Sequence, residues 1–127
     1  MFEIDKIPAE IYDSLSAKGV ARENILLGAY CDRNCEHEPQ DVYLLATSKE
    51  LWVLFGVFAG KHSHSGHHHY ETAWEEAECH TYPLDSISRF QIEELISGSR
   101  FTALTTSGEP IFITAMTKNA PTPRPTA

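Results

Sequence analysis

The histidines are the residues of this chain whose type and spacing most clearly suggest chemistry. Five of the seven lie close together, at positions His62, His64, His67, His68 and His69. Neutral imidazoles are good ligands for zinc, nickel and copper, and thiolates can complete such a site. A second group of metal-binding types stands upstream, at Cys31, Cys35 and His37.

These eight residues support two interpretations. In an antiparallel meander the loops that follow the first and third strands lie at the same end, so the two groups could meet around zinc or another transition metal. Against this, the spacing C-x3-C-x-H is not that of a standard zinc finger or ribbon. A His-rich tract in a polar Gly/Ser loop usually binds metal only opportunistically. A metal-responsive module is therefore the alternative hypothesis, and no cofactor is required.

The residues that could serve catalysis favour no enzyme. Glu71, Glu75, Glu76 and Glu78 form a run on a half-exposed strand, whereas acid–base catalysis needs paired carboxyls in an apolar cleft. Cys79 and His80 are neighbours, and neighbouring strand residues point to opposite faces. The chain also lacks a P-loop, a dinucleotide-binding glycine turn and a nucleophile elbow. We predict a protein that is not an enzyme.

The stretch 40–58 organises the chain around two strands joined at 47–50. In the second strand Leu51, Val53, Phe55 and Val57 point one way, and a second apolar set points the other way. A hairpin that is apolar on both faces must be covered on both, one cover being its own core and the other a helix or a partner. The second set is therefore the predicted interface: Trp52, Leu54 and Phe58.

The remaining elements predict a mainly β fold. A short helix is expected over 7–19, where Ile7, Ile11 and Leu15 form one apolar stripe. About seven strands follow, with a bulge near Glu75 and Glu76 in the fourth. We expect a seven-stranded antiparallel barrel or sandwich preceded by this helix. The predicted strands cover 24–32, 41–46, 51–58, 69–82, 87–96, 99–106 and 110–117, with a polar loop at 59–68.

Length and composition indicate one domain. The 127 residues divide into a domain at 1–117 and a Pro-rich extended tail or linker at 118–127. The net charge of −8 argues against nucleic acid and anionic lipid as partners. No membrane-length apolar run or signal peptide is evident, and three cysteines do not suggest a disulfide framework. We place the protein in the cytoplasm.

Three segments carry a resemblance to a known fold: YLLATSKELWVLFG, YPLDSIS and SGSRFTALTTSGE, in that order. Seven strands in a meander with these segments resemble the bacterial pleckstrin-homology-like (PH-like) domain. The segment from Tyr82 to Gly98 is similar to a domain that precedes the membrane segments of some bacterial ABC exporters. The Pro-rich tail departs from the family, because it cannot form the helix that usually closes one end of the barrel.

The resemblance implies a non-catalytic interaction or regulatory domain. Its partner would be another protein or a second copy of itself, and an ABC transporter if the exporter resemblance holds, which would put the domain at the cytoplasmic face of a membrane. The family's phosphoinositide-binding mode needs basic residues in the loop between the first two strands. Here that loop holds Glu36, Glu38 and Asp41 against Arg33, so direct lipid binding is not expected.

Overall fold

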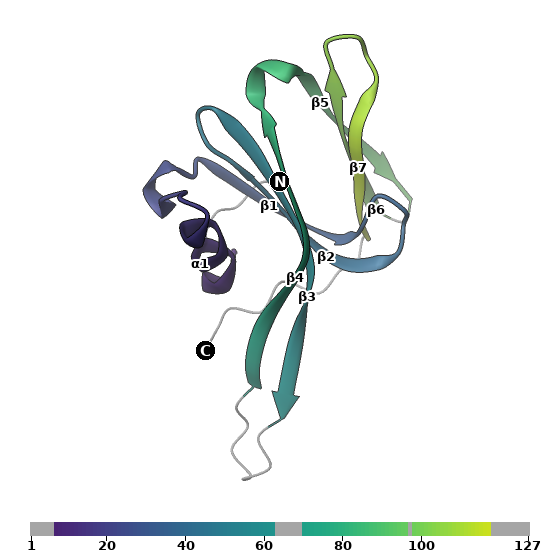
Figure 1. Ribbon diagram of the computed structural model, residues 1–127. Helices are drawn as coiled ribbons and strands as arrows, with labels where there is room; N and C mark the ends of the chain where they lie inside the picture. The colour runs from purple at the N-terminus through teal and green to yellow at the C-terminus, as the bar shows by residue number, and fades with distance from the viewer. Residues whose placement is uncertain (1–6, 63–69, 97, 118–127) are drawn as a thin grey trace.

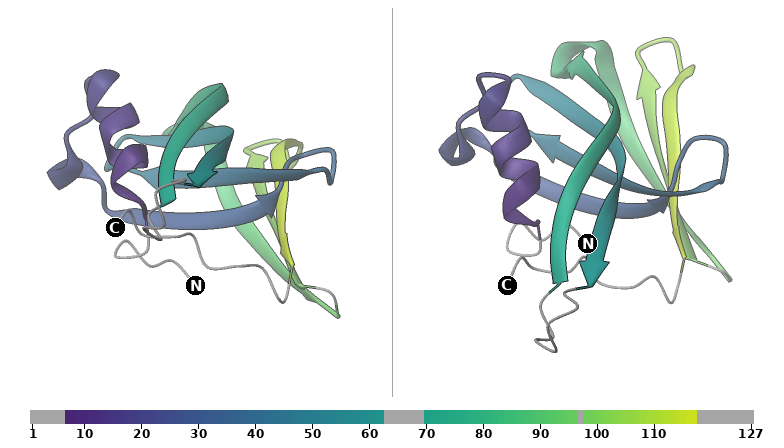
Figure 2. Two further views of the ribbon diagram at one scale, coloured as in Figure 1. Left: turned by 90° about the horizontal axis from the view of Figure 1, so that it is seen from below. Right: turned by 60° about the horizontal axis from the view of Figure 1, so that its bottom comes forward.

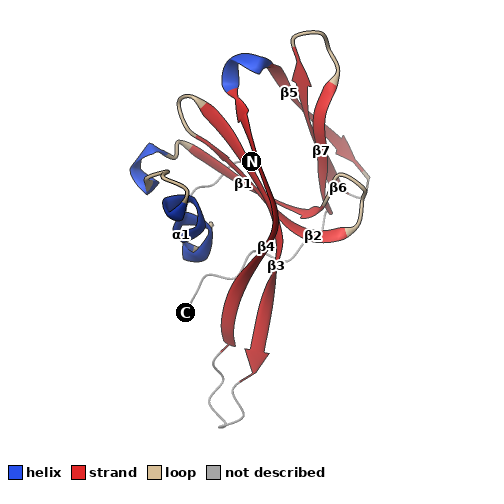
Figure 3. Ribbon diagram, viewed as in Figure 1, coloured by secondary structure: helices blue, strands red, loops and turns tan. Residues whose placement is uncertain are grey.

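The computed structural model describes residues 7–62, 70–96 and 98–117, and it is mainly β (Figure 1, Figure 3). One helix, α1 (Ala9–Ala17), and a 3-10 turn, η2 (Arg22–Asn24), precede seven antiparallel strands. A second 3-10 turn, η3 (Leu84–Ser86), separates the fourth strand from the fifth. The strands are β1 (Leu27–Arg33), β2 (Pro39–Ala46), β3 (Glu50–His62), β4 (Tyr70–Pro83), β5 (Ile87–Leu95), β6 (Gly98–Thr105) and β7 (Pro110–Thr117). The predicted class, seven antiparallel strands after a short N-terminal helix, is confirmed.

All seven strands belong to one sheet, in the order β4-β3-β2-β1-β7-β6-β5. The ladder between β1 and β7 contains a single pair, Arg33 with Ala115. The sheet bends there into two halves, β1–β4 and β5–β7, which face each other (Figure 1, Figure 2). At the other side η3 carries the chain from β4 to β5, the two edge strands of the sheet.

The inner core fills the space between the two halves. Both halves contribute buried side chains to it: Ala29, Cys31, Val42, Leu44, Leu51, Val53, Phe55, Phe101, Ala103 and Phe112. One polar contact joins the halves inside this core, because Thr114 Oγ1 donates a hydrogen bond to Cys31 Sγ at 3.0 Å. Leu51, Val53 and Phe55, which were predicted to share one face of β3, all lie in this inner core. Val57, predicted for the same face, is 44% exposed.

The outer core lies on the opposite face of β2–β4, beneath α1. Ile11 and Leu15 of the helix stripe have no exposed surface. They belong to one buried cluster with Tyr43, Leu45 and Leu54 of the sheet. The molecule therefore has three layers: α1, the β1–β4 half and the β5–β7 half (Figure 2). The second cover of the central hairpin is its own helix, and α1 does not reach the open side between the two halves.

A cluster of polar side chains fastens α1 to β4. Glu76 Oε1 accepts hydrogen bonds from Ser14 Oγ at 2.7 Å and from Trp74 Nε1 at 3.2 Å. Glu76 Oε2 pairs with Lys18 Nζ at 2.9 Å. Partial burial alone would raise the pKa of Glu76, but the hydrogen bonds from Ser14, Lys18 and Trp74 outweigh it and lower that pKa. The ionised carboxylate thus stabilises the helix on the sheet.

A bulge in β4 decides which side its acidic residues face. Phe55 of β3 lies opposite Glu78, but Gly56 lies opposite Glu76, so Ala77 is the extra residue. The predicted bulge is confirmed close to its expected position. One added residue reverses the alternation, and Glu76 faces α1 whereas Glu78 faces the space between the halves. Cys79 packs on the outer core and His80 on the inner side, as expected for neighbours on a strand.

Two predicted boundaries are wrong by three residues or more. The first strand begins at Leu27 rather than at position 24, because residues 22–24 form η2. The loop predicted at 59–68 is strand at its start, since β3 continues to His62 and pairs with β4 as far as Tyr70. Backbone pairing along the longer partner strand outweighs the polar, Gly-containing sequence of this segment. The tail predicted at 118–127 lies outside the described residues.

Candidate functional site

A pocket of about 440 Å³ opens between the two halves of the sheet. Its floor comes from β3, its walls from β4 and β7, and its rim from the turn between β1 and β2. The lining residues are Asn34, Cys35, Glu36, Glu38, Gln40, Phe55, Glu78, His80, Tyr82, Ile111 and Phe112. The bend of the sheet creates this space, because the halves diverge on the side that α1 leaves uncovered.

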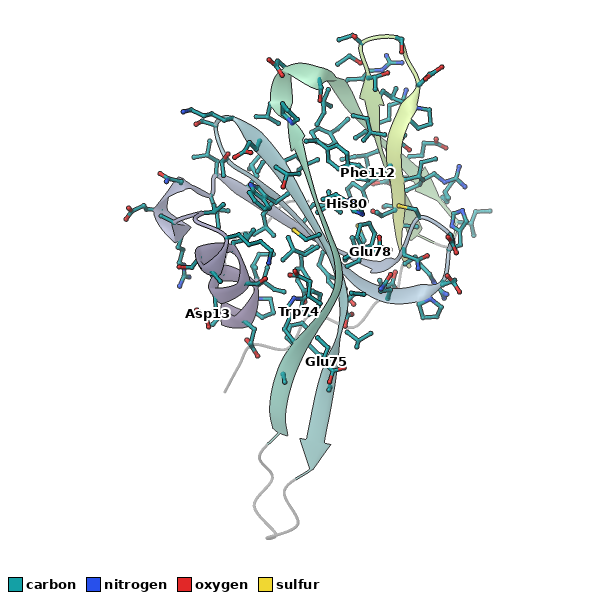
Figure 4. All side chains as sticks on the ribbon, in the orientation of Figure 1. Asp13, Trp74, Glu75, Glu78, His80 and Phe112 are labelled. Carbon is teal, nitrogen blue, oxygen red and sulfur yellow. The ribbon has the colours of Figure 1, made fainter. Side chains whose placement is uncertain are left out.

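Four rings form a continuous series across the pocket. The Phe55 and His80 rings meet edge to face with centroids 5.9 Å apart. His80 stacks on Tyr82 at 6.3 Å, and Tyr82 stacks on Phe112 at 5.7 Å with an angle of 26° between the ring planes. The last contact bridges the two halves, since Tyr82 belongs to β4 and Phe112 to β7. Figure 4 shows His80 and Phe112 in the space between the halves, with Trp74 on the side of α1.

The charged groups that line the pocket are acidic. Glu78 Oε2 lies 3.1 Å from His80 Nε2, and both side chains are exposed. The rim adds Glu36 and Glu38, and among the lining residues there is no lysine or arginine. Asn34 orders this rim, because its Oδ1 accepts the backbone N–H of Glu36 at 2.9 Å and of Glu38 at 3.0 Å. The rim is therefore preformed and negative.

Tyr82 contributes a neutral hydroxyl to this setting. Partial burial raises the pKa of Tyr82, and the nearby Cys35 and Glu78 raise it further. The phenol therefore keeps its proton at neutral pH. It presents an O–H donor and an aromatic face, without a negative charge of its own.

This arrangement suits a cation. Aromatic faces attract ammonium and guanidinium groups through the ring quadrupole, and carboxylates at the rim complete the charge pairing. A cysteine nucleophile would need a hydrogen bond to its base. No hydrogen bond joins Cys35 Sγ to His80 in the described part of the chain, although both line the pocket.

Four of the eight predicted metal ligands lie within the described residues, namely Cys31, Cys35, His37 and His62. Cys31 is buried in the inner core, and burial raises the pKa of its thiol to about 12, so it is not a ready thiolate. Cys35 and His37 lie on the exposed β1–β2 turn. His62 ends β3, and His64, His67, His68 and His69 lie outside the described residues. Within residues 7–62, 70–96 and 98–117, no three His, Cys, Asp or Glu side chains are grouped to hold a metal ion.

The predicted interface residues lie beneath or beside α1. Leu54 has no exposed surface, and Trp52 and Phe58 pack against the same outer core. The indole Nε1 of Trp52 is buried there and has no hydrogen-bond partner among the described residues. The outer core that they join is covered by α1, and their role as an interface stays a prediction.

Several pocket residues were not predicted as site residues. The sequence pattern places Glu78 in an acidic run on a half-exposed strand, and His80 on the face opposite to that of Cys79. Tyr82 and Phe112 were not considered for the site. The signal that could have located the first two is the predicted bulge, because it turns Glu78 and His80 together toward the side occupied by Phe55. Nothing local to β7 indicates that Phe112 meets them.

Comparison of the chain with protein-family models, with curated proteins and with solved structures finds no match in any of the three. None of the helices in the described residues has the length and apolar character needed to cross a membrane.

Proposed function

We propose that this chain is a non-catalytic interaction domain that captures an arginine or lysine side chain of a protein partner. The observation that carries the proposal is the pocket between the two halves, where a series of stacked rings meets three carboxylates. A guanidinium can lie flat on Tyr82 or Phe112 while its N–H groups reach Glu78 and the rim glutamates. A protein segment that presents such a side chain fits the size and the charge of the site.

The same charges argue against an anionic ligand. A lipid headgroup or a nucleic-acid phosphate placed here would meet Glu36, Glu38 and Glu78 with no lysine or arginine among the lining residues. Like charges across a contact are repulsive, and they select against wrong partners. The net charge of −8 acts in the same direction at long range.

The fold resemblance supports the same class of function. Two antiparallel meanders, β1–β4 and β5–β7, joined by the pairing of β1 with β7, are compatible with a PH-like domain, which we propose as its affiliation. The exporter resemblance makes the cytoplasmic face of an ABC transporter the first partner to examine. The pocket argument does not depend on either resemblance.

The test is a titration with N-acetyl-arginine methylamide, followed by backbone amide chemical shifts. We expect shifts for the β1–β2 turn and for residues around Glu78 and His80. N-acetyl-citrulline methylamide has nearly the same shape without the charge, and it should shift these amides far less. A cation–π contact at an exposed site is worth about 0.5–1 kcal/mol, so a difference of about threefold or more is expected between the two probes.

A matched pair of variants completes the experiment. Glu78→Gln removes a pocket carboxylate and should weaken arginine binding about three- to fivefold. Glu23→Gln removes an equal charge on η2, next to α1 and away from the pocket, and should leave binding unchanged. Equal binding of arginine and citrulline, or equal loss in both variants, would contradict the proposal.

A further inference from the structure

The free edge of β5 is the second surface of interest, and it lies apart from the pocket chemistry. β5 pairs with β6 along one side, and within the described residues no strand pairs with its other side. Its side chains Phe90, Ile92 and Leu95 are 42%, 49% and 41% exposed. An edge strand with unpaired backbone groups and exposed apolar side chains is a template for another strand.

The two faces of β5 are chemically distinct. Phe90 lies opposite Ala103 of β6, and Ile92 lies opposite Phe101, two residues that are buried in the inner core. Because opposite residues share a face, Phe90 and Ile92 extend the inner face of the sheet toward its margin. Arg89, Gln91 and Glu93 alternate with them and occupy the outer face.

We propose that β5 pairs antiparallel with β5 of a second copy of this chain, about a two-fold axis that passes through Gln91. In this register Gln91 lies opposite Gln91 of the second copy. Phe90 then lies opposite Ile92, and Arg89 lies opposite Glu93, each pair occurring twice by symmetry. The apolar pair adds to the inner face, and the charged pair lies on the outer face.

Charge complementarity supports this occupant. Glu93 already lies 4.0 Å from Arg100 of β6, on the outer face. Adding the second copy places its Arg89 on the other side of Glu93. Positive, negative and positive side chains then alternate across three adjacent strands, and cross-strand pairs of opposite charge stabilise a sheet.

The neighbouring registers lose this match. If the axis moves to Phe90, Ile87 lies opposite Glu93 and Arg89 opposite Gln91. If it moves to Ile92, Phe90 lies opposite Glu94 and Arg89 opposite Leu95. Each of these registers keeps one apolar pair on its axis, Phe90 with Phe90 or Ile92 with Ile92, but it loses the pairs of opposite charge that the register centred on Gln91 provides. The sequence of β5 therefore specifies the alignment as well as the partner.

A cross-link tests the register directly, in a Cys35→Ser background that removes the exposed native thiol. Gln91→Cys places two thiols opposite each other across the axis, where Cα atoms in an antiparallel pair are about 4.5–5.5 Å apart. That separation allows a disulfide. Glu94→Cys is the control, because its two copies would be displaced by six residues, about 20 Å along the strand. Oxidation should yield a covalent dimer from Gln91→Cys and not from Glu94→Cys.

Reversal of charge tests the same pairing without cysteines, using the concentration dependence of the mass in sedimentation equilibrium. Arg89→Glu should raise the dimer dissociation constant by about tenfold or more, because both symmetric pairs change from attractive to repulsive. Adding Glu93→Arg to Arg89→Glu should recover part of the loss. The recovery is partial because the introduced arginine also faces Arg100.

An apolar control separates the β5 edge from general surface hydrophobicity. Ile92→Lys should abolish the dimer, whereas Val57→Lys alters a similarly exposed apolar residue, 44% against 49%, on β3 and should leave it intact. A protein that is monomeric over the whole concentration range would overturn the proposal. A dimer that resists both Arg89→Glu and Ile92→Lys, or a cross-link that forms equally from Glu94→Cys, would overturn it as well.

Discussion

The two edge strands of the sheet, β4 and β5, differ in the side chains that they offer to another strand. The middle of β4 carries Glu75, Glu76 and Glu78, so a second copy aligned along it would meet the same charges. β5 carries both signs, and its apolar residues Phe90, Ile92 and Leu95 are exposed. Like charges along an edge discourage strand addition, whereas mixed charges and apolar side chains permit it. β4 is therefore an edge that disfavours strand addition, here called the guarded edge, and β5 is an edge that permits it, here called the open edge.

The guarded edge also has an internal attachment that the open edge lacks. β4 pairs with β3 over thirteen residue pairs and is fastened to α1 through Glu76. β5 pairs with β6 alone among the described strands. We therefore expect changes in β4 to affect the stability of the fold and changes in β5 to affect association.

The largest effect on stability is expected from Gly56→Ala, which alters the contact of β3 with the bulged part of β4. An added Cβ at Gly56 would approach the Trp74 ring to 2.8 Å and collide with the backbone carbonyl of Glu75. The bulged backbone cannot give way easily, so the free energy of unfolding should fall by about 2–3 kcal/mol. Urea unfolding followed by circular dichroism measures the loss.

Gly19→Ala is the matched control for that substitution. Nothing lies within 4 Å of a Cβ added there, and the cost comes from the positive φ of +89° alone. About 1 kcal/mol is expected. Equal losses at the two positions would show that packing against Trp74 does not decide the effect at Gly56.

An intermediate effect is expected from Glu76→Gln, at the junction of α1 with β4. The variant loses the ion pair with Lys18 and weakens the hydrogen bonds from Ser14 and Trp74, so we expect a loss of about 1 kcal/mol at neutral pH. Glu75→Gln removes a charge from the neighbouring position, which faces away from α1, and should change stability by less than about 0.5 kcal/mol. A larger loss from Glu75→Gln than from Glu76→Gln would refute the role of the junction.

The pH dependence of this difference sharpens the same prediction. The pKa of Glu76 is lower in the folded protein than its ordinary value of 4.5, so ionisation favours the folded state. The contribution is complete above pH 4.5 and disappears as the pH falls through the folded-state pKa. Unfolding curves of the wild type and of Glu76→Gln should therefore converge below that pH. A constant difference across the acid range would argue against the carboxylate as its source.

The smallest effect on stability is expected at the open edge. Arg89→Glu and Ile92→Lys alter exposed positions of β5, and at concentrations where the protein is monomeric each should change the free energy of unfolding by about 0.5 kcal/mol or less. Thermal unfolding of dilute protein provides the measurement. A loss as large as that of Gly56→Ala would mean that β5 belongs to the stable framework, and the contrast between the edges would disappear.

The local pattern of apolar and polar residues predicted the helix and the strands of this fold well. Alternation in β3 assigned Leu51, Val53 and Phe55 to one face and Trp52, Leu54 and Phe58 to the other, and the structure confirms both sets. What covers the second set was left open between a helix and a partner, and in the structure α1 packs on the outer core that this set joins. The extent of β3 was underestimated, because its last residues, including His62, are held by pairing with β4 and not by their own propensity.

The pocket could not be predicted from the local pattern of the sequence. It depends on the bend at Arg33 and Ala115, which brings Phe112 of β7 to Tyr82 of β4. Such a contact joins residues distant in sequence, and neither partner carries a periodic signal for it. The rim glutamates were recognised as acidic, but their convergence with Glu78 follows only from the folded sheet. The role of the metal-ligand types in the 62–69 tract stays a prediction.

The extra residue at Ala77 has a consequence for how this chain can change through evolution. Substitutions at Glu78 or His80 change the charge and the rings that line the pocket, and they leave the contacts of α1 untouched. Deletion of Ala77 would remove the bulge without disturbing the pairing, because Gly56 would still lie opposite Glu76 and Phe55 opposite Glu78. Glu78 and His80 would therefore keep their side of the sheet. Deletion of a paired residue between Ala77 and Pro83 would instead shift the ladder with β3, so the length of this strand can change at Ala77 more easily than elsewhere.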